Sequence, residues 1–101
     1  MNSRKPSLFN EPSDGCWVCK NPNVVMHHIY GGNGRRPISD AEGCYIFLCP
    51  YHHNMSDFGI HFDKKFDLAI KQQCQRLWEE REGIDEPDHE TFISYFDRNY
   101  L

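Results

Sequence analysis

Two short pairs of metal-binding residue types restrict the fold of this chain more than any other feature. The first pair is Cys16-x2-Cys19, and the second, far along the chain, is Cys49-x2-His52. Each separation allows two side chains of a tight turn to reach one tetrahedral ion, and thiolate combined with imidazole suits zinc. The sequence therefore predicts a structural Zn²⁺ that joins two distant segments.

Length and cysteine usage explain why such an ion is expected. A chain of 101 residues has room for one domain and buries little apolar surface, so it needs an additional stabilising element. Five cysteines cannot form a complete set of disulfides, and no apolar targeting or membrane-spanning segment is evident, so we expect a cytoplasmic protein with reduced thiols. Two alternatives stay open: His53 could replace His52, or Cys44 could be a ligand. We expect Cys44 and Cys74 to be buried as small apolar residues.

The hydrophobic pattern predicts an α+β domain. Residues 1–13 lack apolar periodicity and are expected to form a flexible arm, while residues 14–101 form one domain. Within that domain, residues 14–62 should hold the zinc knuckle and two antiparallel strands, and residues 63–101 should be helical. The expected elements are strands at 24–30 and 44–48 around a loop at 31–40, a helical turn from Pro50, a long helix from an Asp63 N-cap to about Gly83, and a short helix from about Asp88 whose Phe92, Ile93 and Phe96 pack inward.

Histidines left over from the zinc site indicate a second, open metal site. His27, His28, His53 and His61 all lie between the first cysteine and the long helix. Hydrolysis needs coordination positions that are free for water and phosphate, which a closed zinc site does not have. Neighbouring strand residues point to opposite faces, so His27 and His28 must have different roles. Phosphodiester hydrolysis offers two such roles, a metal ligand and a general base.

Taken together, these motifs resemble the HNH endonucleases. The resemblance rests on Cys16 to Cys19, Met26 to Gly32, Arg35-Arg36, Ser39-Asp40, Tyr45 to His53, Gly59 to Asp63, Gln75 and Phe96 to Leu101. More narrowly, they are similar to small phage and prophage HNH proteins that are related to the phage recombination-enhancement nucleases. The resemblance covers roughly residues 14–101.

The resemblance implies a ββα-metal site, also called a His-Me finger, with added C-terminal helices. In such a site His28 activates water, while His27, His53 and His61 bind a catalytic Mg²⁺, Mn²⁺ or similar divalent ion. Asn54 or a loop residue would orient His28 through a hydrogen bond. The expected activity is hydrolysis of DNA phosphodiester bonds.

Contact with DNA is expected from Arg35 and Arg36, which could reach phosphates beside the scissile bond. The formal net charge of −4 argues against general, charge-driven binding of nucleic acid. A recombinase or another phage protein is therefore an expected partner in the bacterial host cell. The alternative function is a zinc-stabilised DNA- or protein-binding module without catalysis, which would have no need of the additional histidines.

Overall fold

A two-stranded antiparallel sheet lies at the centre of the computed structural model, which describes residues 4–32 and 34–101. Strand β1 (Val25–His28) pairs with β2 (Tyr45–Leu48) so that Val25 faces Leu48 and His28 faces Tyr45. Both strands consist mainly of β-branched, aromatic and other large side chains, which favour this conformation. The predicted α+β class and the antiparallel pairing are confirmed, with shorter strands than expected.

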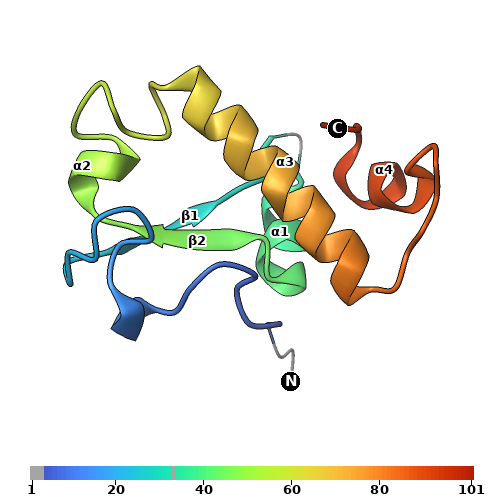
Figure 1. Ribbon diagram of the computed structural model, residues 1–101, viewed down its shortest axis with the longest axis horizontal. Coiled ribbons are helices and arrows are strands. Elements are labelled where there is room, and N and C mark those ends of the chain that lie inside the picture. Colours follow the sequence, from blue (N-terminus) through green and yellow to red (C-terminus); the bar gives the residue numbers. More distant parts are fainter. Residues whose placement is uncertain (1–3, 33) are drawn as a thin grey trace.

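Helix α2 (Pro50–His53) follows β2 directly at one end of the sheet (Figure 1). Pro50 occupies the first turn, where its missing N–H costs nothing. The chain after α2 folds back on the helix, because Ile60 N–H donates to the His52 carbonyl and His61 N–H to the His53 carbonyl. A side chain at Gly59 would collide with the His53 carbonyl, so this close return requires glycine.

The long helix α3 (Lys64–Arg81) crosses the sheet diagonally (Figure 1). The Asp63 carboxylate accepts hydrogen bonds from the backbone N–H groups of Lys65 and Phe66, so the predicted N-cap is confirmed. The buried side of α3 carries Ile70, Cys74 and Trp78. Cys74 and Cys44 are both fully buried in the core, as expected.

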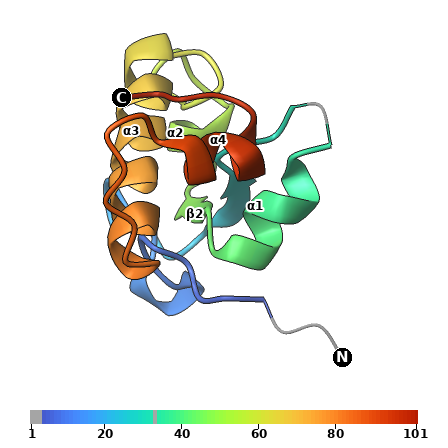
Figure 2. The same cartoon turned by 90° about the vertical axis from the view of Figure 1, so that its right-hand side faces the viewer.

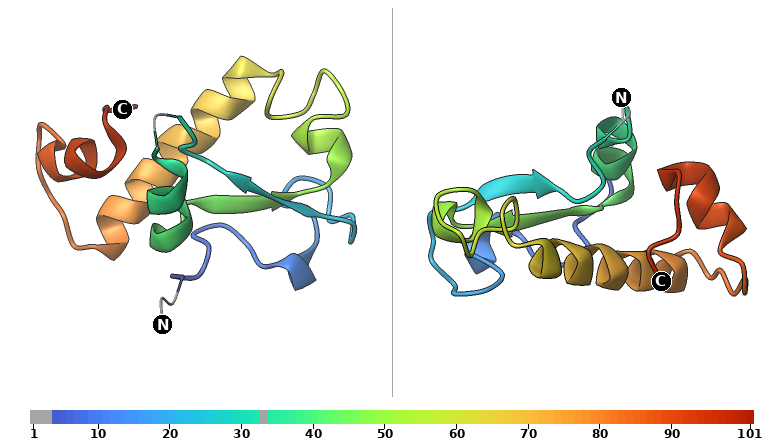
Figure 3. Two further views of the ribbon diagram at one scale, coloured as in Figure 1. Left: turned by 180° about the vertical axis from the view of Figure 1, so that it is seen from behind. Right: turned by 90° about the horizontal axis from the view of Figure 1, so that it is seen from above.

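Helix α1 (Arg36–Glu42) was not predicted, because the Gly-rich and Pro-containing segment before it indicated a loop that continued to Asp40. Pro37 in fact lies in the first turn, and Gly43 ends the helix in the left-handed conformation with a φ of 81°. The buried Ser39 hydroxyl accepts from Tyr30 N–H and donates to the Cys44 carbonyl. Helices α1 and α3 lie on opposite sides of the strands (Figures 2 and 3).

The N-terminal segment differs from the flexible arm that the sequence predicts. Residues 1–3 lie outside the described residues, but Lys5 and Leu8 donate backbone hydrogen bonds to Ala41 and Gly43. The buried Asn10 amide donates to the Phe47 carbonyl and accepts from Phe47 N–H, so it pairs with β2 as a neighbouring strand would. Polar residues that satisfy backbone groups in this way leave no apolar periodicity in the sequence.

Helix α4 (Glu90–Phe96) and the C-terminal tail pack around Tyr30 and Trp78. Phe92 and Phe96 are buried as predicted, whereas Ile93 is 36% exposed, so the expectation that it packs inward is wrong. Seven residues form only two turns, and the two phenylalanines occupy the side that faces the core. No helix within the described residues is long and apolar enough to cross a membrane.

Candidate metal centres

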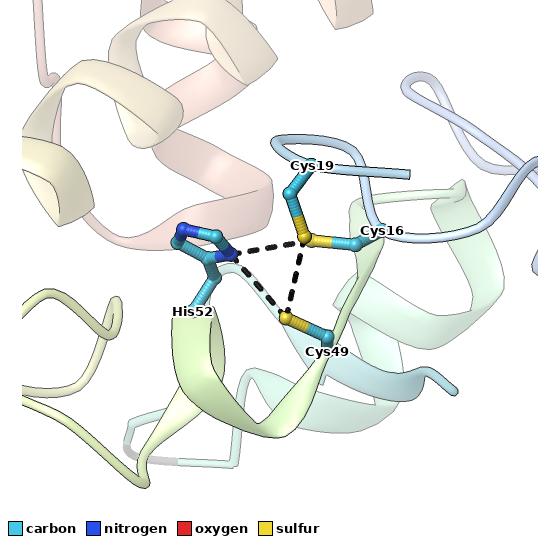
Figure 4. Close-up of side chains that lie close together, drawn as sticks. All are labelled: Cys16, Cys19, Cys49 and His52. Carbon is cyan, nitrogen blue, oxygen red and sulfur yellow. Dashed lines mark hydrogen bonds between the residues drawn. The ribbon is translucent and has the colours of Figure 1, made fainter. Parts of the chain in front are cut away.

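The predicted zinc ligands converge from two distant segments (Figure 4). Cys16 and Cys19 lie in a tight loop before β1, in which Lys20 N–H donates to the Cys16 carbonyl and Cys16 N–H to the Asn21 carbonyl. Gly15 must be glycine, because it has a φ of 78° and a side chain there would collide with the Lys20 carbonyl. Cys49 precedes α2, and His52 lies within that helix.

Distances within this four-residue cluster fit a tetrahedral zinc ion. Zn–S bonds of about 2.3 Å place two sulfur ligands about 3.8 Å apart and a sulfur and a nitrogen ligand slightly closer. The Cys19 and Cys49 sulfurs are 3.7 Å apart. The His52 Nδ1 atom lies 3.6 Å from the Cys16 sulfur and 3.3 Å from the Cys49 sulfur. The cluster is therefore compatible with a structural metal such as zinc, with His52 rather than His53 or Cys44 as the fourth ligand.

Backbone amides prepare one of the thiols for metal binding. Burial opposes ionisation of Cys16, but hydrogen bonds from the backbone of Cys49, Cys19 and Val18 outweigh it and lower its pKa to about 6. Burial and the neighbouring thiols instead raise the pKa of Cys49. Cys16 thus favours the thiolate form at neutral pH, whereas metal binding at Cys49 must displace a proton.

Three of the leftover histidines form a second cluster. His27 comes from β1, His53 is the last residue of α2, and His61 lies in the loop that returns to α2. Their ring centroids are 4.4 to 5.2 Å apart. The Nε2 atoms of His53 and His61 are 2.9 Å apart, close to the separation of about 3.0 Å between adjacent ligands of an octahedral ion with bonds of about 2.1 Å.

His27 provides the strongest indication of a ligand in this cluster. Its ring is buried, and its Nε2 atom has no hydrogen-bond partner within the described residues. Burial, together with the nearby His61 and His53 rings, lowers the pKa of His27 to about 3. The ring is therefore neutral, which is the form that binds metals, and a buried nitrogen without a partner is costly unless something binds it.

His28 lies beside this cluster but interacts with different groups. Its Nε2 atom is 3.0 Å from Asp40 Oδ1, and the Arg36 Nε–H donates to its Nδ1 atom over 3.2 Å. Because Nδ1 accepts from Arg36, Nε2 carries the proton and donates it to Asp40. The hydrogen bond from His28 lowers the pKa of Asp40, against a smaller opposing effect of burial and with additional help from Arg4.

A single pocket of about 230 Å³ connects the three-histidine cluster with His28 and Arg36. Its lining residues are Met26, His27, His28, Gly31, Arg36, His53 and His61. The two neighbouring histidines of β1 thus contact separate groups, as the alternation of strand side chains predicts, while both border the same space.

Other predicted site residues lie elsewhere. Asn54 follows the last residue of α2, is exposed, and makes no hydrogen bond with His28, so the structure does not bring these two residues together. Arg35 contacts the C-terminal segment instead, through the Tyr95 carbonyl at 3.1 Å and Asp97 at 3.5 Å. The sequence did not single out Asp40 as the partner of His28, because Asp40 reaches His28 from the unpredicted helix α1.

Comparisons of the chain with protein-family models, with curated proteins and with solved structures find no match. The function of this chain must therefore be inferred from the chemistry of its site.

Proposed function

We propose that this protein is a metal-dependent DNA endonuclease of the HNH type. The observation that supports this proposal is the pocket in which three imidazoles capable of binding one ion lie next to an oriented fourth histidine, His28. The order of β1, β2 and α2, with histidines on β1 and α2, agrees with a ββα-metal arrangement in which α1 occupies the loop between the strands. A binding module without catalysis would have no need of these additional histidines.

In this proposal His27, His53 and His61 hold the catalytic ion. Such an ion, when bound, stabilises negative charge on the scissile phosphate and the leaving oxygen. Three imidazoles suit a transition-metal ion better than Mg²⁺, which prefers oxygen ligands. We therefore expect Mn²⁺, Co²⁺, Ni²⁺ or Zn²⁺ to support more activity than Mg²⁺.

His28 acts as the general base in this proposal, and Asp40 positions it. The Asp40 carboxylate accepts the Nε2 proton, so the free electron pair of His28 is on Nδ1, the atom that Arg36 contacts. When a phosphate draws Arg36 away, Nδ1 becomes free to accept a proton from water. Arg36 thus links substrate binding to the exposure of the base. We propose further that the substrate is DNA, that the protein acts in a bacterial cytoplasm, and that a recombinase or another phage protein is its partner.

Nicking of supercoiled plasmid tests these roles in zinc-loaded protein supplied with each divalent ion in turn. His28→Ala should reduce the rate about 10²- to 10⁴-fold, the usual contribution of a general base, and keep the second ion. Asp40→Asn should reduce the rate about 10- to 100-fold, as expected for a residue that orients a catalytic group.

Asn54→Ala is the matched control and should retain nearly full activity, because Asn54 is exposed, does not line the pocket and is not among the hydrogen-bond partners of His28. Absence of cleavage with every ion would refute the endonuclease and favour the binding module. Equal rates for His28→Ala and the unmodified protein would refute the role of His28.

A further inference from the structure

We propose that Arg35, Lys71 and Arg98 form a phosphate-binding pocket for the DNA strand that enters the histidine pocket. This inference rests on the proposed endonuclease function, because it specifies how the substrate of that site is held. The cationic pocket, as we call it, has a volume of about 250 Å³. It is lined by Tyr30, Gly31, Gly32, Arg35, Lys71, Phe96, Asp97, Arg98 and Tyr100.

The charges of the cationic pocket favour an anion. Three cationic side chains line it against one carboxylate, Asp97, in a chain whose overall charge is negative. Arg98 is exposed and lies over the Tyr100 ring at 5.0 Å, and no ion pair of its guanidinium is found among the described residues. The Arg35 Nε–H is buried and likewise lacks a partner in the described part of the chain. Free guanidinium donors match the oxygens of a phosphate.

The C-terminal tail is held firmly enough to form part of a binding site. It returns from α4 across α3 (Figure 2), where the fully buried Gln75 side chain donates to Asn99 Oδ1 and accepts from Tyr100 N–H. Gln72 donates to the Tyr100 carbonyl, and the Tyr100 ring stacks on Tyr30 with centroids 5.2 Å apart. These contacts place Arg98 at the pocket without requiring Arg98 itself for folding.

The cationic pocket adjoins the pocket that is lined by the three-histidine cluster and His28. Lys71 also lines a neighbouring hollow together with His27 and His61, and Gly31 borders the histidine pocket, this hollow and the cationic pocket. Gly31 and Gly32 carry no side chains that could separate these spaces. A strand whose scissile phosphate lies at the three histidines can therefore place another of its phosphates between Arg35, Lys71 and Arg98.

Lys71 can join such a contact while keeping its present partner, and Arg35 can exchange a weak partner for a stronger one. Lys71 forms an ion pair with Asp67 at 2.8 Å, which uses one of its three ammonium donors. The contact of Arg35 with Asp97 is long, at 3.5 Å, and this carboxylate is exposed. A phosphate oxygen is a stronger partner for Arg35 than an exposed carboxylate at this distance.

The test is the binding of fluorescent oligonucleotides to protein that carries one equivalent of zinc, in the cysteine cluster, with excess zinc and all other divalent ions removed, so that the three histidines hold no ion and no cleavage occurs. Arg98→Gln should weaken binding about tenfold, as expected for the loss of a charge-assisted hydrogen bond, and should reduce the slope of log affinity against log salt by about 1. Arg98→Lys should recover part of the affinity because it restores the charge. Arg76→Gln removes an exposed arginine of α3 outside the pocket and should change affinity less than about twofold.

Two results would overturn the inference: unchanged DNA affinity of Arg98→Gln, or an equal loss of DNA affinity with Arg76→Gln. In the first case, NMR spectra of the Arg98 guanidinium would show whether inorganic phosphate binds there instead. The two proposals fail separately. A protein that never cleaves but binds DNA through Arg98 refutes only the endonuclease, and one that cleaves with the same KM for Arg98→Gln refutes only the cationic pocket.

Discussion

The two metal-binding clusters differ sharply in their surroundings, although neighbouring residues of α2 contribute to both. His52 belongs to the cysteine cluster, whose four ligands leave no free position around a tetrahedral ion. His53 belongs to the histidine cluster, which supplies three ligands and borders a pocket. The first arrangement joins distant segments, and the second leaves space in which a ligand could reach a bound ion.

This difference indicates that, in a small chain, the residues that stabilise the fold can be separate from those that bind a second ion. Helix α2 has four residues, too few to be stable alone. Its position therefore depends on the Cys49 and His52 ligands, and that position in turn brings His53 to His27. We infer that the zinc site supports the histidine cluster mechanically, while the histidine cluster contributes little to folding.

The largest expected effect is loss of the fold when the cysteine cluster is broken. Structural Zn²⁺ contributes on the order of 10 kcal/mol in small zinc domains, comparable to the whole stability of a chain of this size. Cys49→Ser, or removal of zinc with a chelator, should abolish the cooperative thermal transition seen by circular dichroism. Cys74→Ala is the control, because Cys74 is buried outside the cluster and its variant should retain zinc. A Cys49→Ser protein that folds without zinc would contradict the inference that the cysteine cluster stabilises the fold.

The next effect separates the neighbouring histidines. His53→Ala should weaken the affinity for the second ion more than about 100-fold, because removal of a residue that only supports a ligand already lowers metal affinity about 10- to 100-fold. The free energy of unfolding should change by less than about 1 kcal/mol. His52→Ala should instead lose zinc and stability. Calorimetric titration and thermal unfolding measure both quantities. Similar behaviour of the two variants would show that the clusters are not separate.

The smallest effect concerns a contact remote from both clusters. Burial opposes ionisation of Glu42, but hydrogen bonds from Trp78 and Lys5 outweigh it and lower the pKa of its carboxyl group. A lowered folded-state pKa gives stability that is present above the unfolded value, about 4.3, and is lost as the pH falls through the folded value. Glu42→Gln should therefore lower the unfolding free energy by about 1–2 kcal/mol at pH 7.

This difference between Glu42→Gln and the unmodified protein should narrow below about pH 4. Urea unfolding at several pH values provides the measurement. Glu80→Gln, an exposed position on α3, serves as the control and should show neither effect. A constant difference at all pH values would exclude the carboxylate as its source, and altered metal binding would mean that Glu42 is not independent of the clusters.

Local patterns allowed much of the architecture to be predicted. The three-residue spacings identified the cysteine cluster, because such spacings determine which side chains share a turn. Likewise, the Asp63 cap and the periodicity through Trp78 identified α3, because both signals lie within the helix itself. Alternation along β1 correctly separated the contacts of His27 from those of His28.

Features that depend on distant contacts could not be predicted. The pairing of Asp40 with His28 requires α1 to pack beside β1, and a glycine- and proline-rich segment gives no periodic signal of that helix. Docking of the N-terminal segment depends on the Asn10 side chain reaching Phe47. Gln75 holds the C-terminal tail through the same kind of contact, in which one buried amide replaces a ladder of backbone bonds.

The side chains of His52 and His53 point to different clusters, and this has a consequence for how such a protein can evolve. Because the candidate ligands of the cysteine cluster are separate from those that face the pocket, we expect that substitutions at His27, His53 or His61 would alter the preferred metal without unfolding the chain. On the proposed function, the same scaffold would thus acquire new metal chemistry, or lose catalysis, through single mutations. Within the single turn of α2, His52 would be required for folding, whereas His53 could change without loss of the fold.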